Sequence, residues 1–151
     1  MCLPVKPYKI EREWYHHGLQ CAVVQGREGF NRCGYVRVPP GHPAHGKDYD
    51  DVNVRVHGGL TFGSIENCEH EDGTGFWFGF DCAHFGDSYL NPDPTGNTNP
   101  EYQALREIHL ETSRQFTRAP VWEHYWTQQE VEQETENLAE QLAHYDPPPT
   151  N

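Results

Sequence analysis

The feature of the sequence that most constrains the fold is a change in periodicity between its two parts. Runs of β-forming residues occur before residue 81, whereas apolar residues recur at helical intervals after residue 99. Strands followed by helices are typical of an α+β protein. We therefore predict a small mixed or antiparallel sheet with two C-terminal helices packed on one face. The predicted strands cover residues 19–24, 33–38, 52–57 and 76–80.

The predicted strands differ in pattern. Residues 19–24 and 33–38 are separated by a Gly-containing segment, which predicts a hairpin with a longer loop. In residues 52–57, valines alternate with polar residues, as is typical of a strand with one buried face. Residues 76–80 are almost all aromatic and predict a central strand that is apolar on both faces.

The two predicted helices begin at recognisable capping residues. Asn99 and Pro100 are typical of a helix start, and the helical pattern after them extends to Phe116. Thr127 and Glu130 have the spacing of a capping box. The second helix then carries a row of side chains at helical intervals: Val131, Thr135, Leu138, Leu142 and Tyr145. We expect residues 1–146 to form one domain and residues 147–151 to be a disordered tail.

The net charge of −12 is concentrated at the C-terminal end. From Trp122 onward there are seven acidic residues and no Lys or Arg. Binding to DNA or RNA polymers normally needs a basic stripe that neutralises phosphates, and the sequence shows none. No stretch is long and apolar enough to cross a bilayer. We therefore expect neither a nucleic-acid polymer nor a membrane as a partner, and a homo-oligomer stays open.

The five cysteines are widely spaced and form no CxxC pair. Because the N-terminus also lacks the features of a signal peptide, we expect reduced thiols in a cytoplasm. Cys68 and His70 lie in an acidic segment, which we interpret as a solvated charge cluster in preference to a zinc site. The His16-His17 pair is a similarly weak metal motif.

His57-Gly58-Gly59 is the first segment with candidate chemistry. The predicted strand presents His57 on its polar face, and two glycines let backbone N–H groups approach a bound anion. The alternative interpretation is a β-bulge beside a surface histidine, and for so short a motif it is the favoured one.

The second segment begins where the aromatic strand ends. Asp81, His84 and Asp87 are spaced three apart, so they share one side of a helical turn. This arrangement suits a carboxylate that orients an imidazole, or a mixed oxygen and nitrogen metal site. The alternative is that Asp81 caps the turn and His84 is simply half-buried.

Four phrases of the sequence together resemble a known set: GYVRVPPGHP, DYDDVNVRVHGGLTF, FWFGFDCAHFGD and VEQETENLAEQL. They are similar to those of a family of small, uncharacterised proteins encoded by bacteriophages and prophages, over most of residues 15–143. The resemblance implies a phage product made in the host bacterial cytoplasm, but it supplies no enzyme activity. The chain departs from the family pattern at Phe76 and Phe85. The family's shared phrases fall on His42, His57, Gly58, Gly59, Asp81, His84, Gly86 and Asp87.

These observations favour a host-takeover or anti-defence protein that binds a small anionic ligand, with a nucleotide immune signal as the preferred candidate. Arginine would bind the phosphate, and aromatic rings would stack on the base. The predicted ligand-binding residues are Arg37, His42, Arg55, His57, Gly58, Gly59, Asp81, His84 and Asp87.

Two alternatives stay open. One is a metal-dependent hydrolase or phosphodiesterase in which His57, Asp81, His84 and Asp87 hold a divalent ion. The other is an acidic protein that binds and inhibits a host factor. The sequence does not decide between an enzyme and a binding protein, and it identifies no cofactor.

Overall fold

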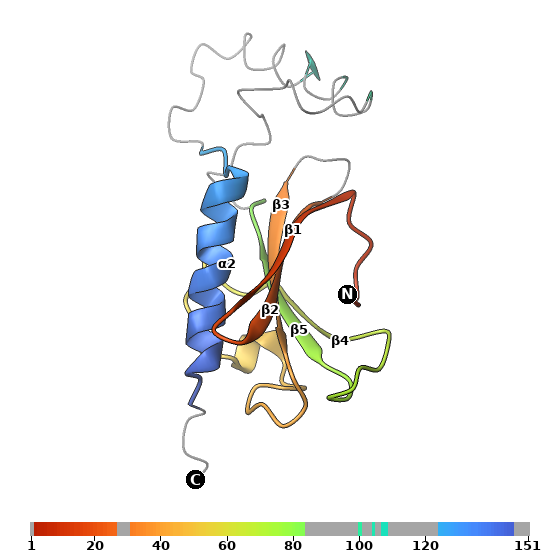
Figure 1. Cartoon of the computed structure of the whole chain (residues 1–151). Coiled ribbons are helices and arrows are strands. Elements are labelled where there is room, and N and C mark those ends of the chain that lie inside the picture. Colours follow the sequence, from red (N-terminus) through yellow and green to blue (C-terminus); the bar gives the residue numbers. More distant parts are fainter. Residues whose placement is uncertain are drawn as a thin grey trace.

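The molecule is built on a five-stranded antiparallel sheet with strand order β1-β2-β3-β5-β4. This computed structural model describes residues 2–26, 31–83 and 124–146, together with positions 100, 104, 107 and 108. Helix α2 lies along one face of the sheet, and the N-terminal segment lies on the other side (Figure 1). The elements are β1 (Lys9–His16), β2 (Leu19–Gln25), β3 (Arg32–Val38), the 3-10 helix η2 (Tyr49–Asp51), β4 (Phe62–Ile65), β5 (Phe76–Asp81) and α2 (Gln128–Ala143).

Strands β2, β3 and β5 confirm three of the predicted strands. β2 and β3 form the predicted antiparallel hairpin, and β5 lies between β3 and β4. The aromatic residues of β5 serve both faces, as expected for a central strand. Phe78 and Phe80 pack in the cluster below α2, whereas Trp77 packs in a second cluster on the opposite face.

Two glycines in the centre of the sheet are each covered by an aromatic ring on the neighbouring strand. Gly34 is paired with Phe80, and Gly79 is paired with Tyr35. A Cβ atom added at Gly34 would lie 2.5 Å from the Phe80 ring, and one at Gly79 would lie 2.5 Å from the Tyr35 ring. The two pairs lie on opposite faces of the sheet, so on each face one aromatic ring packs directly over a glycine.

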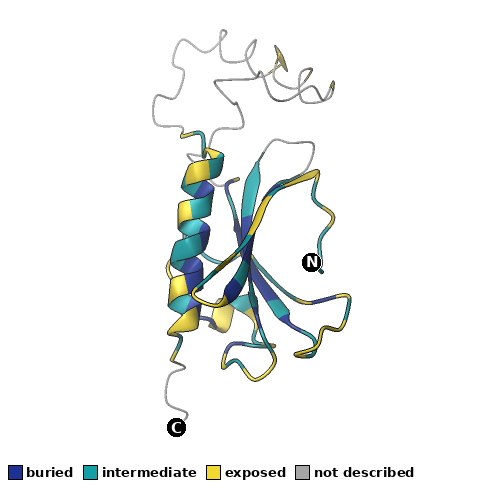
Figure 2. Cartoon of the chain, viewed as in Figure 1, coloured by how far each residue is buried: buried dark blue, intermediate teal, exposed yellow. Residues whose placement is uncertain are grey.

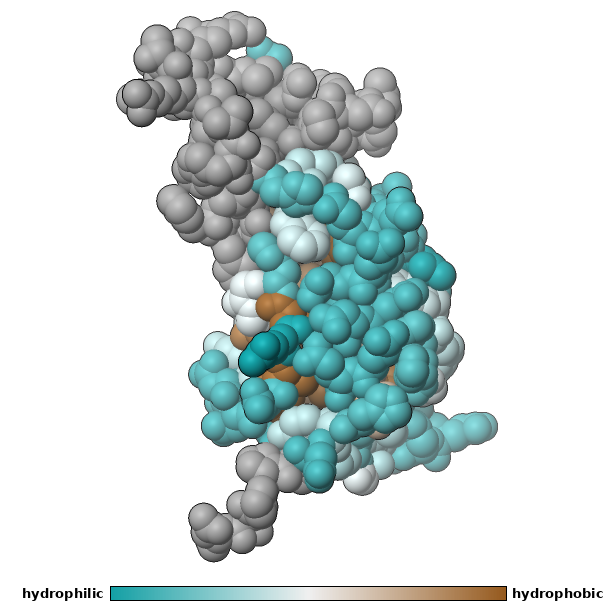
Figure 3. Space-filling model, turned by 90° about the vertical axis from the view of Figure 1, so that its left-hand side faces the viewer, coloured by the Kyte–Doolittle hydropathy of each residue, from teal (hydrophilic) through white to brown (hydrophobic). Residues whose placement is uncertain are grey.

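Helix α2 confirms the predicted second helix. Thr127 and Glu130 form the capping box, with each side chain accepting a hydrogen bond from the other residue's backbone N–H. The buried face of the helix consists of Val131, Thr135, Leu138, Ala139 and Leu142. This face is the dark stripe that points toward the sheet in Figure 2. The other side of the helix is mostly polar, in accordance with the largely hydrophilic surface shown in Figure 3.

The opposite face of the sheet has a smaller core. Its buried residues are Ala22, Val24, Tyr35 and Trp77, with Leu3, Val5, Cys33 and Phe62 packed against them. Leu3 and Val5 come from the N-terminal segment, which therefore covers part of this face. The rest of the face carries polar side chains, and these form the site described below.

The prediction of two C-terminal helices is wrong, because a single helix packs on the sheet in the described part of the chain. The sheet dominates the α+β fold. Most residues of the other predicted helix, from Asn99 to Phe116, lie outside the described residues, as does the predicted tail of residues 147–151.

The predicted strand at residues 52–57 is also wrong, although its burial pattern was read correctly. Val52, Val54 and Val56 do pack toward the core below α2. The backbone of Arg55, however, bonds to helix side chains: its N–H donates to Gln141 Oε1, and its carbonyl accepts from Asn137 and Gln141. Because side chains of α2 take the place of a neighbouring strand, the segment is alternating but is not part of the sheet.

Two further features differ from the sequence-based expectations. Strand β1 was missed, because most of its residues are polar and only Ile10, Trp14 and Tyr15 are large and apolar. Cys2 and Cys68 form a disulfide across 66 residues, which contradicts the expectation that every cysteine is reduced. Cys21, Cys33 and Cys82 are not in disulfides. Among the described residues, no helix has the length and apolar character needed to cross a membrane.

Candidate functional site

The predicted strand-end site is only partly described. Asp81 is the last residue of β5, where its carboxylate accepts hydrogen bonds from Thr61 Oγ1 (3.3 Å) and from the Ala83 backbone N–H (3.2 Å). The second bond is the turn-capping role that was the simpler interpretation of this residue. His84, Gly86 and Asp87 lie outside the described residues.

The His57-Gly58-Gly59 segment is a turn. Gly58 and Gly59 have φ values of 69° and 79°, which are readily accessible only to glycine. The Gly59 N–H donates to the Val56 carbonyl, so one of the two expected anion-binding donors is used within the turn. His57 packs against the ring of Trp126, with the ring centroids 4.2 Å apart.

His57 and Asp81 contact opposite sides of the sheet. Trp126, the neighbour of His57, packs against the core below α2. Asp81 lies near Cys33 and Tyr35 on the other face. Burial raises the pKa of both of these groups, and the charge of Asp81 raises it further. The structure therefore gives no support to a single centre that uses both residues.

His42 and Arg55 both support helix α2. His42 Nε2 is 2.7 Å from the Leu142 carbonyl, and its Nδ1 accepts a hydrogen bond from the Ala44 N–H. These bonds assign the ring proton to Nε2, which donates to the helix end. Arg55 bonds to the helix through its backbone, as described above. Both positions are explained by packing of the helix.

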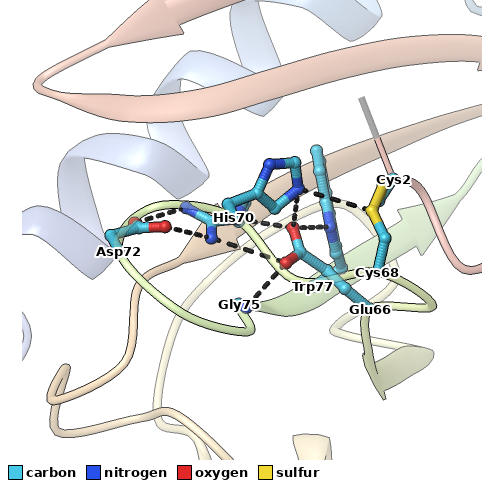
Figure 4. Close-up of a disulfide and its surroundings, with 8 residues drawn as sticks. Cys2, Glu66, Cys68, His70, Asp72, Gly75 and Trp77 are labelled. Carbon is cyan, nitrogen blue, oxygen red and sulfur yellow. Dashed lines mark hydrogen bonds and ion pairs between the residues drawn. A yellow bond between two sulfur atoms is a disulfide. The ribbon is translucent and has the colours of Figure 1, made fainter.

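Arg37 is the predicted binding residue around which the structure builds a site. Its guanidinium donates hydrogen bonds to two carboxylates, those of Glu66 and Asp72, which lie apart from each other in Figure 4. Glu66 accepts from Nε and is fully buried, whereas Asp72 accepts from both terminal nitrogens at 2.9 Å and is half exposed. Arg37 thus has a buried inner partner and a solvent-facing outer partner.

Glu66 connects the whole arrangement. Besides Arg37, it accepts hydrogen bonds from the Gly75 N–H (2.6 Å) and from Trp77 Nε1 (3.0 Å). His70 Nε2 is 3.7 Å from the same carboxylate. Burial acts against ionisation of Glu66, but the bonds from Arg37, Gly75 and Trp77 lower its pKa overall. We therefore assign Glu66 as the buried anion that fixes the loop of residues 66–75.

The same loop brings its backbone very close to Arg37. A Cβ atom at Gly75 would lie 2.3 Å from Arg37 Nε, so only glycine fits there. Backbone hydrogen bonds between Glu66 and Gly75, and between His70 and Gly73, close the loop on itself. The disulfide joins Cys68, on this loop, to Cys2. The outer partner Asp72 therefore stands on a loop that is anchored at several points.

A cavity of about 510 Å³ lies beside Arg37, and we call it the Arg37 pocket. Its volume is within the range of about 300–1,000 Å³ that is usual for ligand sites. Strands β1, β2 and β3 and the turn between β1 and β2 form one side, and the loop with His70 forms the other. The lining residues are Tyr15, Gly18, Leu19, Gln20, Arg37, Pro39, His70, Glu71 and Asp72.

Two of the cysteines are excluded as nucleophiles by their surroundings. Burial raises the pKa of Cys21 to about 12 and that of Cys33 to about 11. Both are therefore neutral thiols at pH 7, whereas the thiolate is the reactive form. In the Arg37 pocket, Arg37 is paired with Glu66 and Asp72, and His70 lies 3.7 Å from Glu66.

Within the described residues, two clusters have the donor atoms to hold a metal ion. One is Cys2, Cys68 and His70, whose two sulfur atoms are joined in the disulfide. The other is His16, His17 and Glu140, at the turn between β1 and β2. The sequence motif at His16-His17, interpreted as weak, thus lies beside a third potential donor, Glu140, from a helix more than a hundred residues away.

Glu66 is the main residue that sequence reasoning missed. It lies in a polar stretch that predicts an exposed loop, and nothing local distinguishes it from the neighbouring acidic residues. The one usable signal was Arg37 between two valines near the end of a strand, because a buried arginine requires a carboxylate partner. The sequence could not show which of the acidic residues would supply it.

Comparison with protein-family models, curated proteins and solved structures found no match to the chain. The resemblance to a phage family therefore remains a prediction from sequence phrases. The function has to be inferred from the chemistry of the site itself.

Proposed function

We propose that the protein is a binding protein that takes a small ligand into the Arg37 pocket and holds an anionic group of that ligand on Arg37. The observation that carries this proposal is the unequal pairing of Arg37. Glu66 is fully buried on one side, whereas the side chain of Asp72 is 49% exposed on the other. The inner ion pair is part of the fold, and the outer one is open to exchange.

Asp72 occupies the position that a ligand anion would take. Its two oxygens accept from two nitrogens of Arg37 in the bidentate geometry that carboxylate and phosphate groups share. An exposed ion pair contributes only about 0–1 kcal/mol, so a ligand can displace Asp72 at small cost. Glu66 meanwhile keeps the guanidinium in place, and the site needs little rearrangement.

The remaining lining of the pocket suits a planar organic group. Tyr15 exposes 72% of its surface beside the cavity, and Gln20 and His70 add hydrogen-bonding groups. A nucleotide combines a phosphate with a base that can stack on an aromatic ring. Because Glu71 and Asp72 also face the pocket, a ligand with one anionic group fits better than a polyphosphate.

The sharpest test removes the internal competitor. Asp72→Asn abolishes the charge that occupies Arg37 while keeping a side chain of the same shape. We expect this variant to bind inorganic phosphate and adenosine monophosphate about two- to fivefold more tightly than the unaltered protein. Titration calorimetry at low ionic strength measures the change, and damage to the fold would weaken binding instead.

Glu71→Gln is the matched control, because it removes an acidic charge from the same loop without releasing Arg37. We expect a smaller gain for this variant. Tyr15→Ala should weaken binding of adenosine monophosphate and leave binding of phosphate unchanged. Equal affinities of Asp72→Asn and Glu71→Gln, or no binding of either probe at millimolar concentration, would overturn the proposal.

A further inference from the structure

A second cluster of chemistry-bearing side chains lies at the same end of strand β1 as the Arg37 pocket, but its side chains contact α2 and do not line that pocket. The turn between β1 and β2 carries His16, His17 and Gly18, and it approaches the C-terminal half of α2 (Figure 1). His17 is the one non-glycine residue among those described with a positive φ, at 52°. With Gly18 at 78°, the pair forms a tight two-residue hairpin turn.

Glu140 of α2 brings the two histidines together. Its Oε1 is 2.9 Å from His16 Nε2 and 3.7 Å from His17 Nε2. The three donor atoms lie within 4.8 Å of one another. Zinc bonds of about 2.0–2.2 Å in a tetrahedral arrangement place neighbouring donor atoms about 3.3–3.6 Å apart. The observed distances between the donor atoms lie on both sides of this range, so small side-chain rotations are enough to bring all three atoms to bonding distance of one ion.

The surroundings are those of a metal-binding histidine. Glu136 Oε2 is 3.8 Å from Nδ1 of His16, the ring nitrogen that does not face Glu140. At 3.8 Å this contact is longer than a hydrogen bond, but it places a carboxylate on the side of the ring where metal-binding imidazoles commonly have one. His144, at the end of α2, packs edge-on against His17 with the ring centroids 5.7 Å apart.

The charge balance also favours a cation at this end of the helix. Glu136 and Glu140 are one helical turn apart, where like charges repel. From Trp122 onward the chain has no Lys or Arg to offset them. The side chains that contact Glu136 and Glu140 are the imidazoles of His16 and His17, while the nearby Arg12 is paired with Glu132.

We propose that His16, His17 and Glu140 bind a divalent transition-metal ion of the zinc class and thereby tie the β1–β2 turn to α2. Two imidazoles and one carboxylate form a ligand set that leaves the fourth position of a tetrahedral ion to water. The ion takes the place of the hydrogen bond between His16 and Glu140. The three ligands are not among the residues that line the Arg37 pocket, although both sites use the β1–β2 turn, and the metal site does not depend on the function proposed above.

The test uses the full chain without an affinity tag, treated with EDTA, dialysed and kept under oxidising conditions so that Cys2 and Cys68 stay joined. Calorimetric titration with ZnCl₂ should show one equivalent bound, and bound zinc should raise the melting temperature. His17→Asn removes the imidazole and keeps a residue that tolerates positive φ. Glu140→Gln keeps the shape and removes the charge. Each variant should weaken zinc binding at least tenfold and lose the thermal shift.

Two variants serve as controls. His124→Gln disrupts an exposed pair of histidine and Glu130 that lies outside the cluster. His70→Gln removes the imidazole beside the disulfide. Both should bind zinc as the unaltered protein does. The proposal is overturned if the unaltered protein binds no stoichiometric zinc, if His17→Asn binds as tightly as His124→Gln, or if His70→Gln abolishes the binding.

Discussion

The two faces of the sheet are stabilised in different ways, although the same strands form both. Below α2, the core is apolar and consists of strand residues such as Val36 and Phe78 packed against Leu138 and Leu142 of the helix. On the other face, a small apolar cluster adjoins the ion pair of Arg37 and Glu66. The helix side is closed by packing, whereas the opposite side leaves a cavity beside an arginine.

This difference explains why the Arg37 pocket lies where it does. Among the described residues, α2 packs on the other face, and the N-terminal segment covers the part of this face near Val24 and Trp77. The loop of residues 66–75 closes over the rest and is fixed by hydrogen bonds to Glu66, which leaves space between it and the strands. Polar organisation of this face therefore goes together with a cavity.

The largest effect should come from the polar face. Glu66→Ala removes the buried partner of Arg37 and leaves the Gly75 N–H and Trp77 Nε1 without their acceptor. Breaking a buried ion pair from one side costs about 3–5 kcal/mol, because the remaining charge is left uncompensated. We expect a loss of this size in the free energy of unfolding, measured by urea denaturation. Glu71→Ala, on the same loop, is the control and should change it by less than about 0.5 kcal/mol.

A small effect of Glu66→Ala would invalidate the comparison of the two faces. In that case Asp72 alone would be sufficient to balance Arg37, and the loop would be held by its backbone bonds and the disulfide. The protection of the Gly75 amide against hydrogen exchange separates these possibilities, because it depends directly on Glu66.

Gly34 and Gly79 allow the two faces to be compared with one kind of substitution. A Cβ atom at Gly34 meets both Phe80 and Thr135 Oγ1 of α2, the latter at 2.2 Å. At Gly79 it meets Tyr35, which is slightly exposed, and the backbone at 3.1 Å. Overpacking typically costs about 1–3 kcal/mol. We expect Gly34→Ala to lie at the upper end of this range and Gly79→Ala at the lower end, measured by thermal and urea denaturation. The opposite order would show that the helix adapts more easily than the pocket side.

The same contrast explains which parts of the fold could be predicted from sequence. Strands β2, β3 and β5 and helix α2 have strong local patterns, because their apolar residues face a core at regular intervals. The segment at residues 52–57 has such a pattern too, but Gln141 and Asn137 supply its backbone partners, and no local signal shows that. β1 is an edge strand and is paired with another strand along one edge only. Most of its residues are therefore exposed, and few of them are apolar.

The candidate sites were less predictable, because both depend on partners far apart in the chain. Arg37 was identified as a possible phosphate-binding residue. Its ion pairs with Glu66 and Asp72, however, form only when the loop of residues 66–75 folds against it. His16-His17 was interpreted as a weak metal motif, and only the docking of α2 brings Glu140 to it. His57 and Asp81 each follow a hydrophobic segment, but their contacts lie on opposite sides of the sheet.

The smallest expected effect is the acid dependence of the outer ion pair. The hydrogen bonds from Arg37 lower the pKa of Asp72 below its ordinary value of 3.8. The folded protein therefore binds this proton more weakly than the unfolded chain does, so the stabilisation is complete well above pH 4 and is lost as the pH falls through the folded pKa. Because Asp72 is half exposed, we expect a contribution of about 0–1 kcal/mol. Asp72→Asn should be less stable than the unaltered protein at pH 7 by this amount, and the difference should shrink as the pH is lowered toward 2. Urea denaturation at both pH values measures the difference.

A difference in unfolding free energy that is unchanged at pH 2 would show that Asp72 stabilises the loop by its shape and not by its charge. The ion pair of Arg37 and Asp72 would then be less open to exchange with a ligand than the exposure of Asp72 suggests.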